Sequence, residues 1–99
     1  MTISGALSDE AIQKKLEAFR GWEVVDGQLQ KTYSFNNFMT ALDLVNKVAL
    51  VAEHHNHHPD ILIKYSKVTF MLSTHDEHGI TDKDFQMVRE IEQLAALSL

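Results

Sequence analysis

Apolar residues recur along the chain at two spacings, one typical of helices and one typical of strands. Between Asp9 and Phe19 they fall every three or four positions, which predicts an amphipathic helix. Ser8 precedes this segment as an N-cap, and Gly21 follows it as a stop signal. The apolar side of the predicted helix consists of Ala11, Ile12, Leu16 and Phe19.

Two further pairs of segments have the residue patterns of strands, in which apolar and polar residues alternate when one face is buried. The first pair, Trp22–Val25 and Leu29–Phe35, flanks Asp26-Gly27, a dipeptide favoured in hairpin turns because it tolerates positive φ. The second pair, Ile61–Tyr65 and Lys67–Ser73, is rich in Ile, Val, Thr and aromatic residues and leaves room only for a very short turn. Each pair predicts a β-hairpin.

The longest predicted helix begins at Asn36 or Asn37 and ends near His54. It carries two adjoining apolar stripes, whereas a helix that lies on a sheet needs only one. We therefore expect a homodimer or homotetramer that associates through helix 36–54. The alternative is a single wide core face in a monomer. The stripes consist of Phe38, Leu42, Val45, Ala49 and Ala52, and of Leu44, Val48 and Val51.

A third helix follows Thr81, which is a suitable N-cap, with Asp84 at the third helical position as in a capping box. The full order of elements is then α-β-β-α-β-β-α. Two hairpins joined through a helix predict an α+β domain with a four-stranded antiparallel sheet and three helices on one face. We expect residues 1–99 to form a single domain.

Composition narrows the classes of function. The chain has 99 residues, a net charge of −5 and no cysteine, and its basic residues are scattered. Nucleic-acid binding is not expected, because phosphate recognition needs clustered Lys and Arg. No segment reaches the roughly 20 apolar residues that span a bilayer. We expect a cytoplasmic protein that contacts neither nucleic acid nor membrane.

Four of the six histidines lie within five residues, at positions 54, 55, 57 and 58. A metal site is one interpretation, because His54 and His58 are four residues apart. Pro59 argues against a helix that continues through His58, and the zincin pattern is missing, so we expect no metal. For His54 and His55, a solvated position at the end of the helix is the preferred interpretation.

Acid–base catalysis is the third interpretation, and it concerns His57, His58 and His75. Imidazole titrates near neutral pH and both donates and accepts protons at similar cost. His57 and His58 occupy a turn just before a strand, and His75 follows the last strand. The short second hairpin is expected to bring that strand end back to His58. His78, beside Gly79, is expected to be solvated.

The sequence resembles the pterin-4a-carbinolamine dehydratase family over nearly its whole length. The resemblance rests on five features. They are a Gly-Trp pair before the first strand, a glutamate upstream of a His-His-Pro unit, a Tyr-x-x-Val hairpin, a Ser-Thr-His sequence at the end of a strand, and an acidic residue in the first turn of the last helix. These are Gly21-Trp22, Glu53, His57-His58-Pro59, Tyr65-Ser66-Lys67-Val68, Ser73-Thr74-His75 and Asp84.

The resemblance implies dehydration of 4a-hydroxytetrahydrobiopterin, or a related 4a-hydroxytetrahydropterin, to the quinonoid dihydropterin. The pterin would be the substrate, no cofactor would be needed, and the product would serve aromatic amino acid hydroxylases. The resemblance also implies that His57 and His58 act as acids on the hydroxyl and His75 as the base toward N5. Glu53 would orient the site, Ser73 and Thr74 would pair with the ring edge through their backbone, and Asp84 would support the site.

Two positions depart from the pattern of well-studied members, which carry Asp at position 56 and Trp at position 61. Here Asn56 removes a charge beside the histidines, and Ile61 removes an aromatic wall. The family also includes dimerisation cofactors of a transcription factor. A binding module that uses helix 36–54, or a family member repurposed in another pterin pathway, therefore stays open as an alternative.

Overall fold

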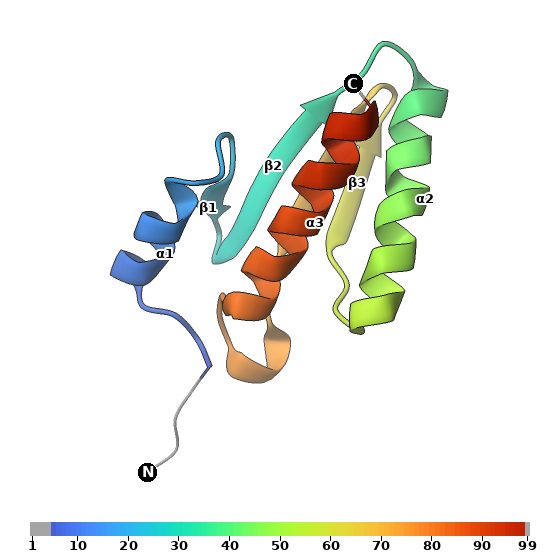
Figure 1. Cartoon of the computed structure of the whole chain (residues 1–99). Coiled ribbons are helices and arrows are strands. Elements are labelled where there is room, and N and C mark those ends of the chain that lie inside the picture. Colours follow the sequence, from blue (N-terminus) through green and yellow to red (C-terminus); the bar gives the residue numbers. More distant parts are fainter. Residues whose placement is uncertain (1–4, 99) are drawn as a thin grey trace.

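The computed structural model describes residues 5–98 and shows the predicted order of helices and strands, with one short 3-10 helix added (Figure 1). The prediction of an α+β fold with a four-stranded antiparallel sheet is confirmed. The elements are α1 (Asp9–Leu16), β1 (Glu23–Val25), β2 (Gln28–Ser34), α2 (Phe38–His55), β3 (Asp60–Lys64), β4 (Lys67–Leu72), η1 (His75–Glu77) and α3 (Asp82–Ser98).

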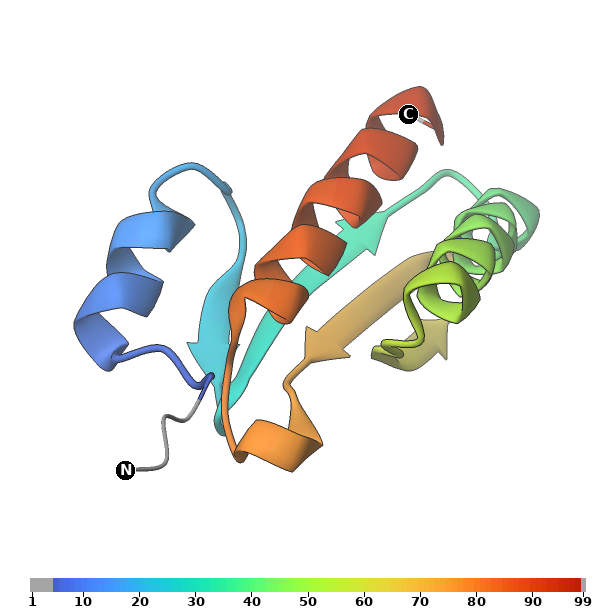
Figure 2. The same ribbon diagram turned by 60° about the horizontal axis from the view of Figure 1, so that its bottom comes forward.

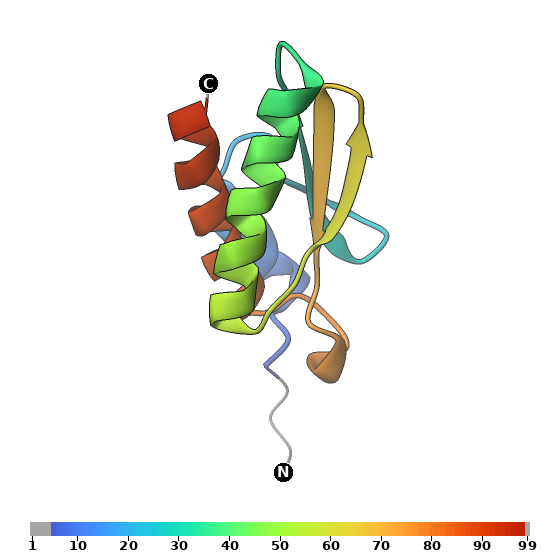
Figure 3. The ribbon, with the colours of Figure 1, turned by 90° about the vertical axis from the view of Figure 1, so that its right-hand side faces the viewer.

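The sheet has the order β1-β2-β4-β3, and all neighbouring strands are antiparallel. The central pair, β2 and β4, comes from different hairpins and is aligned from Leu29 opposite Leu72 to Ser34 opposite Lys67. Figure 3 shows the sheet edge-on, with the helices on one side of it. The core therefore lies between the helices and the inward residues of the two central strands. Its largest fully buried members are Phe70, Leu29, Leu44, Leu72, Met87 and Ile91.

Helix α2 buries members of both predicted stripes. Leu44 and Val48 of the second stripe and Ala52 of the first are buried, together with Ala41. Phe38, from the first stripe, is 42% exposed, and Leu50 on the same helix is 74% exposed. A hydrophobic side chain on the outer face of a helix contributes little to the stability of a monomer. None of the helices within residues 5–98 is long and apolar enough to cross a membrane.

The first helix is shorter than predicted. It ends at Leu16, and the next residues up to Phe19 continue through hydrogen bonds that span three positions, such as Phe19 N–H to the Leu16 carbonyl at 3.0 Å. This tighter turn keeps residues three apart on one side. Phe19 still reaches Phe85 of α3, with ring centroids 6.2 Å apart. The apolar spacing was therefore interpreted correctly as a packing face, and as α-helix it was correct for Asp9–Leu16 but wrong for residues 17–19.

Candidate active site

Three segments that are distant in sequence meet at one end of the molecule: the loop from α2 to β3, the end of β4 with η1, and the start of α3. Figure 2 brings this end forward. Between these segments lies a cavity of about 310 Å³, within the roughly 300–1,000 Å³ typical of small-molecule sites. The cavity is lined by Asn56, His57, His58, Ser73, Thr74, His75, Asp76 and Lys83.

Asn56 directs the chain from α2 into this cavity. It ends the helix in the left-handed conformation (φ 51°, ψ 41°), which asparagine tolerates better than other residues with a side chain. The His57 N–H then donates to the carbonyl of Ala52 at 3.0 Å, which closes the turn. His57 and His58 follow outside the helix, immediately before β3. Asn56 therefore has a backbone role, and its side chain also lines the cavity.

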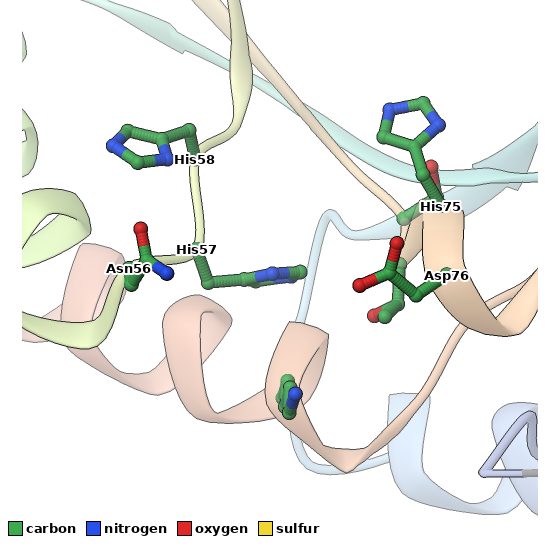
Figure 4. A pocket seen from close by; sticks show the side chains of 8 residues that line it. Asn56, His57, His58, His75 and Asp76 are labelled. Carbon is green, nitrogen blue, oxygen red and sulfur yellow. The ribbon is translucent and has the colours of Figure 1, made fainter.

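His57 is held by a carboxylate that is completely removed from solvent. Asp84 is 0% exposed, and its Oδ1 lies 2.5 Å from His57 Nε2. An ionised carboxylate only accepts hydrogen bonds, so Nε2 carries the proton and Nδ1 is left for the cavity. Figure 4 shows the His57 ring pointing into the cavity toward the segment of His75 and Asp76.

The other oxygen of Asp84 is held by two threonines. The Thr74 hydroxyl donates to Oδ2 at 2.8 Å, and the Thr81 N–H donates to the same oxygen at 2.9 Å. Because the Thr74 proton is used on Asp84, the Thr81 hydroxyl donates to Thr74 Oγ1, 2.8 Å away. Asp84 thus caps α3 and fixes His57 at the same time. Every polar atom of this buried network has a partner, which is what makes burial of the charge tolerable.

His58 has a carboxylate partner of a different kind. Its Nε2 is hydrogen bonded to Glu53 on the last turn of α2, and the two side chains are 52% and 76% exposed. Solvent screens such a pair, so it orients the ring more than it stabilises the fold. In Figure 4 the His58 ring is turned away from His75. His58 therefore lines the cavity at its edge.

His75 approaches from the opposite wall as the first residue of η1 (Figure 4). The fold places it there because Thr74 pairs with Gly79 across the short loop that contains η1. Its ring is exposed and makes no hydrogen bond or ion pair within residues 5–98. Of the histidines that line the cavity, His75 is thus the one without a carboxylate partner among the described residues.

The structure brings together on one cavity the predicted residues His57, His58, His75, Ser73 and Thr74. The other two predicted residues, Glu53 and Asp84, stand behind the cavity and each contact one histidine. Sequence reasoning missed Asp76 and Lys83 as lining residues, because no spacing rule connects them to the histidines. No group of three His, Asp or Glu side chains among the described residues is arranged to hold a metal ion.

Comparison with known proteins was made by sequence and by structure. Residues 5–94 match the family model described as pterin 4 alpha carbinolamine dehydratase. A Herpetosiphon aurantiacus protein named "Putative pterin-4-alpha-carbinolamine dehydratase" is 51% identical, over 91% of this chain and 94% of that protein. The crystal structure of a transcriptional coactivator/pterin dehydratase from Brucella melitensis superposes with a TM-score of 0.86 at 34% identity, covering 91% of this chain and 98% of that one.

A more distant structure shares the fold alone. It is a pterin dehydratase-like protein identified as a RuBisCO assembly factor in the alpha-carboxysome, with a TM-score of 0.63 and 16% identity. The match covers 75% of this chain and 86% of that one. The same architecture therefore occurs in proteins of different function, so the function of this chain has to be inferred from its cavity.

Proposed function

Because the chain belongs to the pterin 4 alpha carbinolamine dehydratase family, we propose that it dehydrates a 4a-hydroxytetrahydropterin to the quinonoid dihydropterin and water. The natural substrate would be 4a-hydroxytetrahydrobiopterin or a close relative, and the product would return to an aromatic amino acid hydroxylase. The observation that carries the proposal is the placement of His57 and His75 on opposite walls of one polar cavity.

The reaction needs one proton donor and one proton acceptor on neighbouring atoms. The C4a–O bond breaks with protonation of the departing hydroxyl, the N5–H bond breaks, and a C4a=N5 double bond forms. Water is the only other product, so no electrons are gained or lost overall. General acid–base catalysis of this kind contributes roughly 10²- to 10⁴-fold per group.

We assign the acid role to His57, assisted by His58, and the base role to His75. The negative charge of Asp84 offsets the positive charge of a protonated His57 ring, and Glu53 does the same for His58. In the proposed reaction His57 and His58 donate while each is hydrogen bonded to a carboxylate, and His75, which has no carboxylate partner among the described residues, accepts the proton. The backbone of Ser73 and Thr74, just beyond the end of β4, would pair with the ring edge of the pterin.

Histidine variants test these roles directly. His57→Ala, His58→Ala and His75→Ala should each lower kcat for 4a-hydroxytetrahydropterin dehydration by about 10²-fold or more, measured by stopped-flow absorbance. His54→Ala is the matched control, because His54 belongs to the same histidine cluster but does not line the cavity. Unchanged turnover in both His57→Ala and His75→Ala would contradict the assignment. We further propose that no metal takes part, so activity should survive EDTA; loss with EDTA and recovery with zinc would refute this.

A second candidate function is a binding module. It is favoured by the apolar side chains that α2 leaves in solvent, where Met39 is 69% exposed and Leu50 is 74% exposed. Leu50→Asp separates the two functions, since it should disturb association and leave the histidine cavity as it is. Loss of dehydration in this variant, with the fold intact, would show that the two are coupled.

A further inference from the structure

His75 is carried by the loop between β4 and α3, and its own side chain does not fix its position. The residue is exposed and its ring has no hydrogen bond or ion pair within residues 5–98. Thr74, which precedes η1, makes no side-chain cap bond to this 3-10 helix. Short 3-10 helices have poorer hydrogen-bond geometry than α-helices. The direction of the His75 ring therefore depends on what holds the backbone of the loop.

The two ends of the loop are joined to each other and to α3. The Thr74 N–H donates to the Gly79 carbonyl at 2.8 Å, and the Gly79 N–H donates back to the Thr74 carbonyl at 3.3 Å. The hydroxyl of Thr74 is bonded to the buried Asp84. These bonds secure Thr74 and Gly79, whereas His75 lies between them.

A second set of contacts comes from residues 5–7, which we call the strap and which run beside the loop between η1 and α3 (Figures 1 and 2). The Gly5 N–H donates to Glu77 Oε2 at 2.8 Å. The Leu7 N–H donates to the Ile80 carbonyl, also at 2.8 Å. Leu7 packs against the hydrophobic core. The strap is thus anchored to the body of the protein and is bonded to the loop at two points.

The strap and the loop are also in close contact through two small residues. A Cβ atom at Gly79 would lie 3.2 Å from the Cβ of Ala6, closer than an ordinary van der Waals contact. Gly79 is not among the glycines with positive φ, so its backbone conformation does not itself require glycine. What glycine provides at this position is room for the strap.

We propose that the strap positions His75 for catalysis, with Glu77 and Gly79 as positioning residues that act through it. The inference rests on the proposed function, because it takes His75 as the proton acceptor of that reaction. A displacement of about 1 Å in a reacting group costs roughly 10²-fold in rate. Neither the strap nor Glu77 nor Gly79 lines the histidine cavity. Loosening the strap should therefore lower kcat and leave KM nearly unchanged.

The first variant, Glu77→Ala, removes the acceptor of the Gly5 N–H. Its kcat for 4a-hydroxytetrahydropterin dehydration should fall about tenfold, with KM changed less than about twofold, in stopped-flow absorbance measurements. Glu77→Gln keeps an acceptor oxygen and should retain kcat within about twofold of the unaltered chain. Glu10→Ala is the matched control, because it removes the same charge from an exposed position on α1. It should leave kcat as in the unaltered chain.

The second variant, Gly79→Ala, tests the strap without altering a charge. The added methyl group should push the loop and the strap apart by roughly a few tenths of an ångström and lower kcat about threefold. Combining this substitution with Ala6→Gly removes the methyl group that the new one meets. The double variant should therefore recover the kcat of the unaltered chain.

Amide hydrogen exchange reports on the loop independently of catalysis. The His78 N–H donates to the His75 carbonyl at 3.1 Å. This amide should exchange faster in Glu77→Ala and in Gly79→Ala than in the unaltered chain, while the circular dichroism spectrum of each variant stays that of the folded protein. Faster exchange in both variants supports the strap, and unchanged exchange in both overturns it.

The kinetic outcomes separate the positioning role from the proposed reaction. Unchanged kcat in Glu77→Ala, equal losses in Glu77→Gln and Glu77→Ala, or no recovery on adding Ala6→Gly to Gly79→Ala overturns the positioning of His75. If the unaltered chain does not accelerate dehydration, the proposed reaction is overturned instead. The exchange rates then decide by themselves whether the strap holds the loop.

Discussion

Replacing Asp84 with asparagine changes the charge of the buried network while keeping its shape. In Asp84→Asn one side-chain oxygen becomes an NH₂ group. If the remaining oxygen keeps the hydrogen bonds of Thr74 and Thr81, at 2.8 and 2.9 Å, the NH₂ group faces His57. A donor then meets Nε2, which must give up its proton and become an acceptor. His57 is forced into the other neutral tautomer, and its protonated form loses the compensating charge.

The expected magnitude follows from the role assigned to His57. If His57 supplies the proton, Asp84→Asn removes most of one acid contribution, so kcat should fall by roughly 10²-fold or more. The loss of kcat should be close to that of His57→Ala. The double variant should be little worse than either single variant, because both substitutions disable the same His57–Asp84 pair. The effect on stability is smaller, about 1–3 kcal/mol for one disturbed buried hydrogen bond.

Stopped-flow dehydration kinetics measure the loss of kcat, and long-range ¹H–¹⁵N NMR of the His57 ring reports the tautomer. Asp82→Asn is the control, because Asp82 lies on the same turn of α3 but is exposed and contacts only Lys15 at 3.4 Å among the described residues. The reasoning is refuted if Asp84→Asn keeps kcat within threefold while His57→Ala loses it. It is equally refuted if the His57 tautomer is the same in both proteins.

Three further outcomes concern stability and association. Asn56→Ala should destabilise the fold by about 1 kcal/mol and lower Tm by roughly 4–8 °C, because Ala lacks the short polar side chain that lets Asn adopt the left-handed conformation. Asn56→Gly should match the unaltered chain, because Gly adopts this conformation readily. Burial raises the pKa of Glu92, but hydrogen bonds from Lys31 and Tyr33 outweigh burial and hold the pKa below its usual value. Because the folded-state pKa is the lower one, this stabilisation is present above the unfolded pKa and is lost as the pH falls through the folded pKa. In urea titrations between about pH 5 and pH 3, the free energy of unfolding should therefore fall less for Glu92→Gln than for the unaltered chain. An equal fall in both would contradict the lowered pKa of Glu92. Finally, a dimer or tetramer through α2 should appear in sedimentation velocity and be weakened by Leu50→Asp, whereas a monomer at micromolar concentration would refute the interface.

The fold was predictable from sequence wherever a local pattern decides the outcome. The Asp26-Gly27 turn, the Asn37 cap of α2 and the two hairpins all express local chemistry, and the structure contains them. The pairing of β2 with β4 was not predictable, because it joins residues such as Leu29 and Leu72 that no local rule connects. Nor did the sequence indicate which members of the two stripes on α2 would be buried, since Leu44, Val48 and Ala52 are buried. Burial of each side chain depends on the positions of α3 and of the strands beneath the helix.

In the candidate site too, features that depend on local sequence were predictable and features that depend on distant residues were not. His58 and His75 were expected to be near one another because a short antiparallel hairpin returns the chain to its starting end, and both line one cavity. The capping position of Asp84 was visible as a local motif. Its complete burial was not, since it depends on Thr74, ten residues away, and on His57, 27 residues away. The η1 turn that presents His75 also went unpredicted, because three residues are too few to create a periodic pattern.

The claim that this chain removes water from a 4a-hydroxytetrahydropterin is tested most directly by coupling it to a pterin-dependent aromatic amino acid hydroxylase with limiting tetrahydropterin. The reaction also contains a reductase that recycles the quinonoid product, and the decay of the 4a-hydroxy intermediate is followed by absorbance. The account predicts that catalytic amounts of the unaltered chain accelerate this decay and that His75→Ala does not. Decay at the same rate with and without the unaltered chain would contradict it.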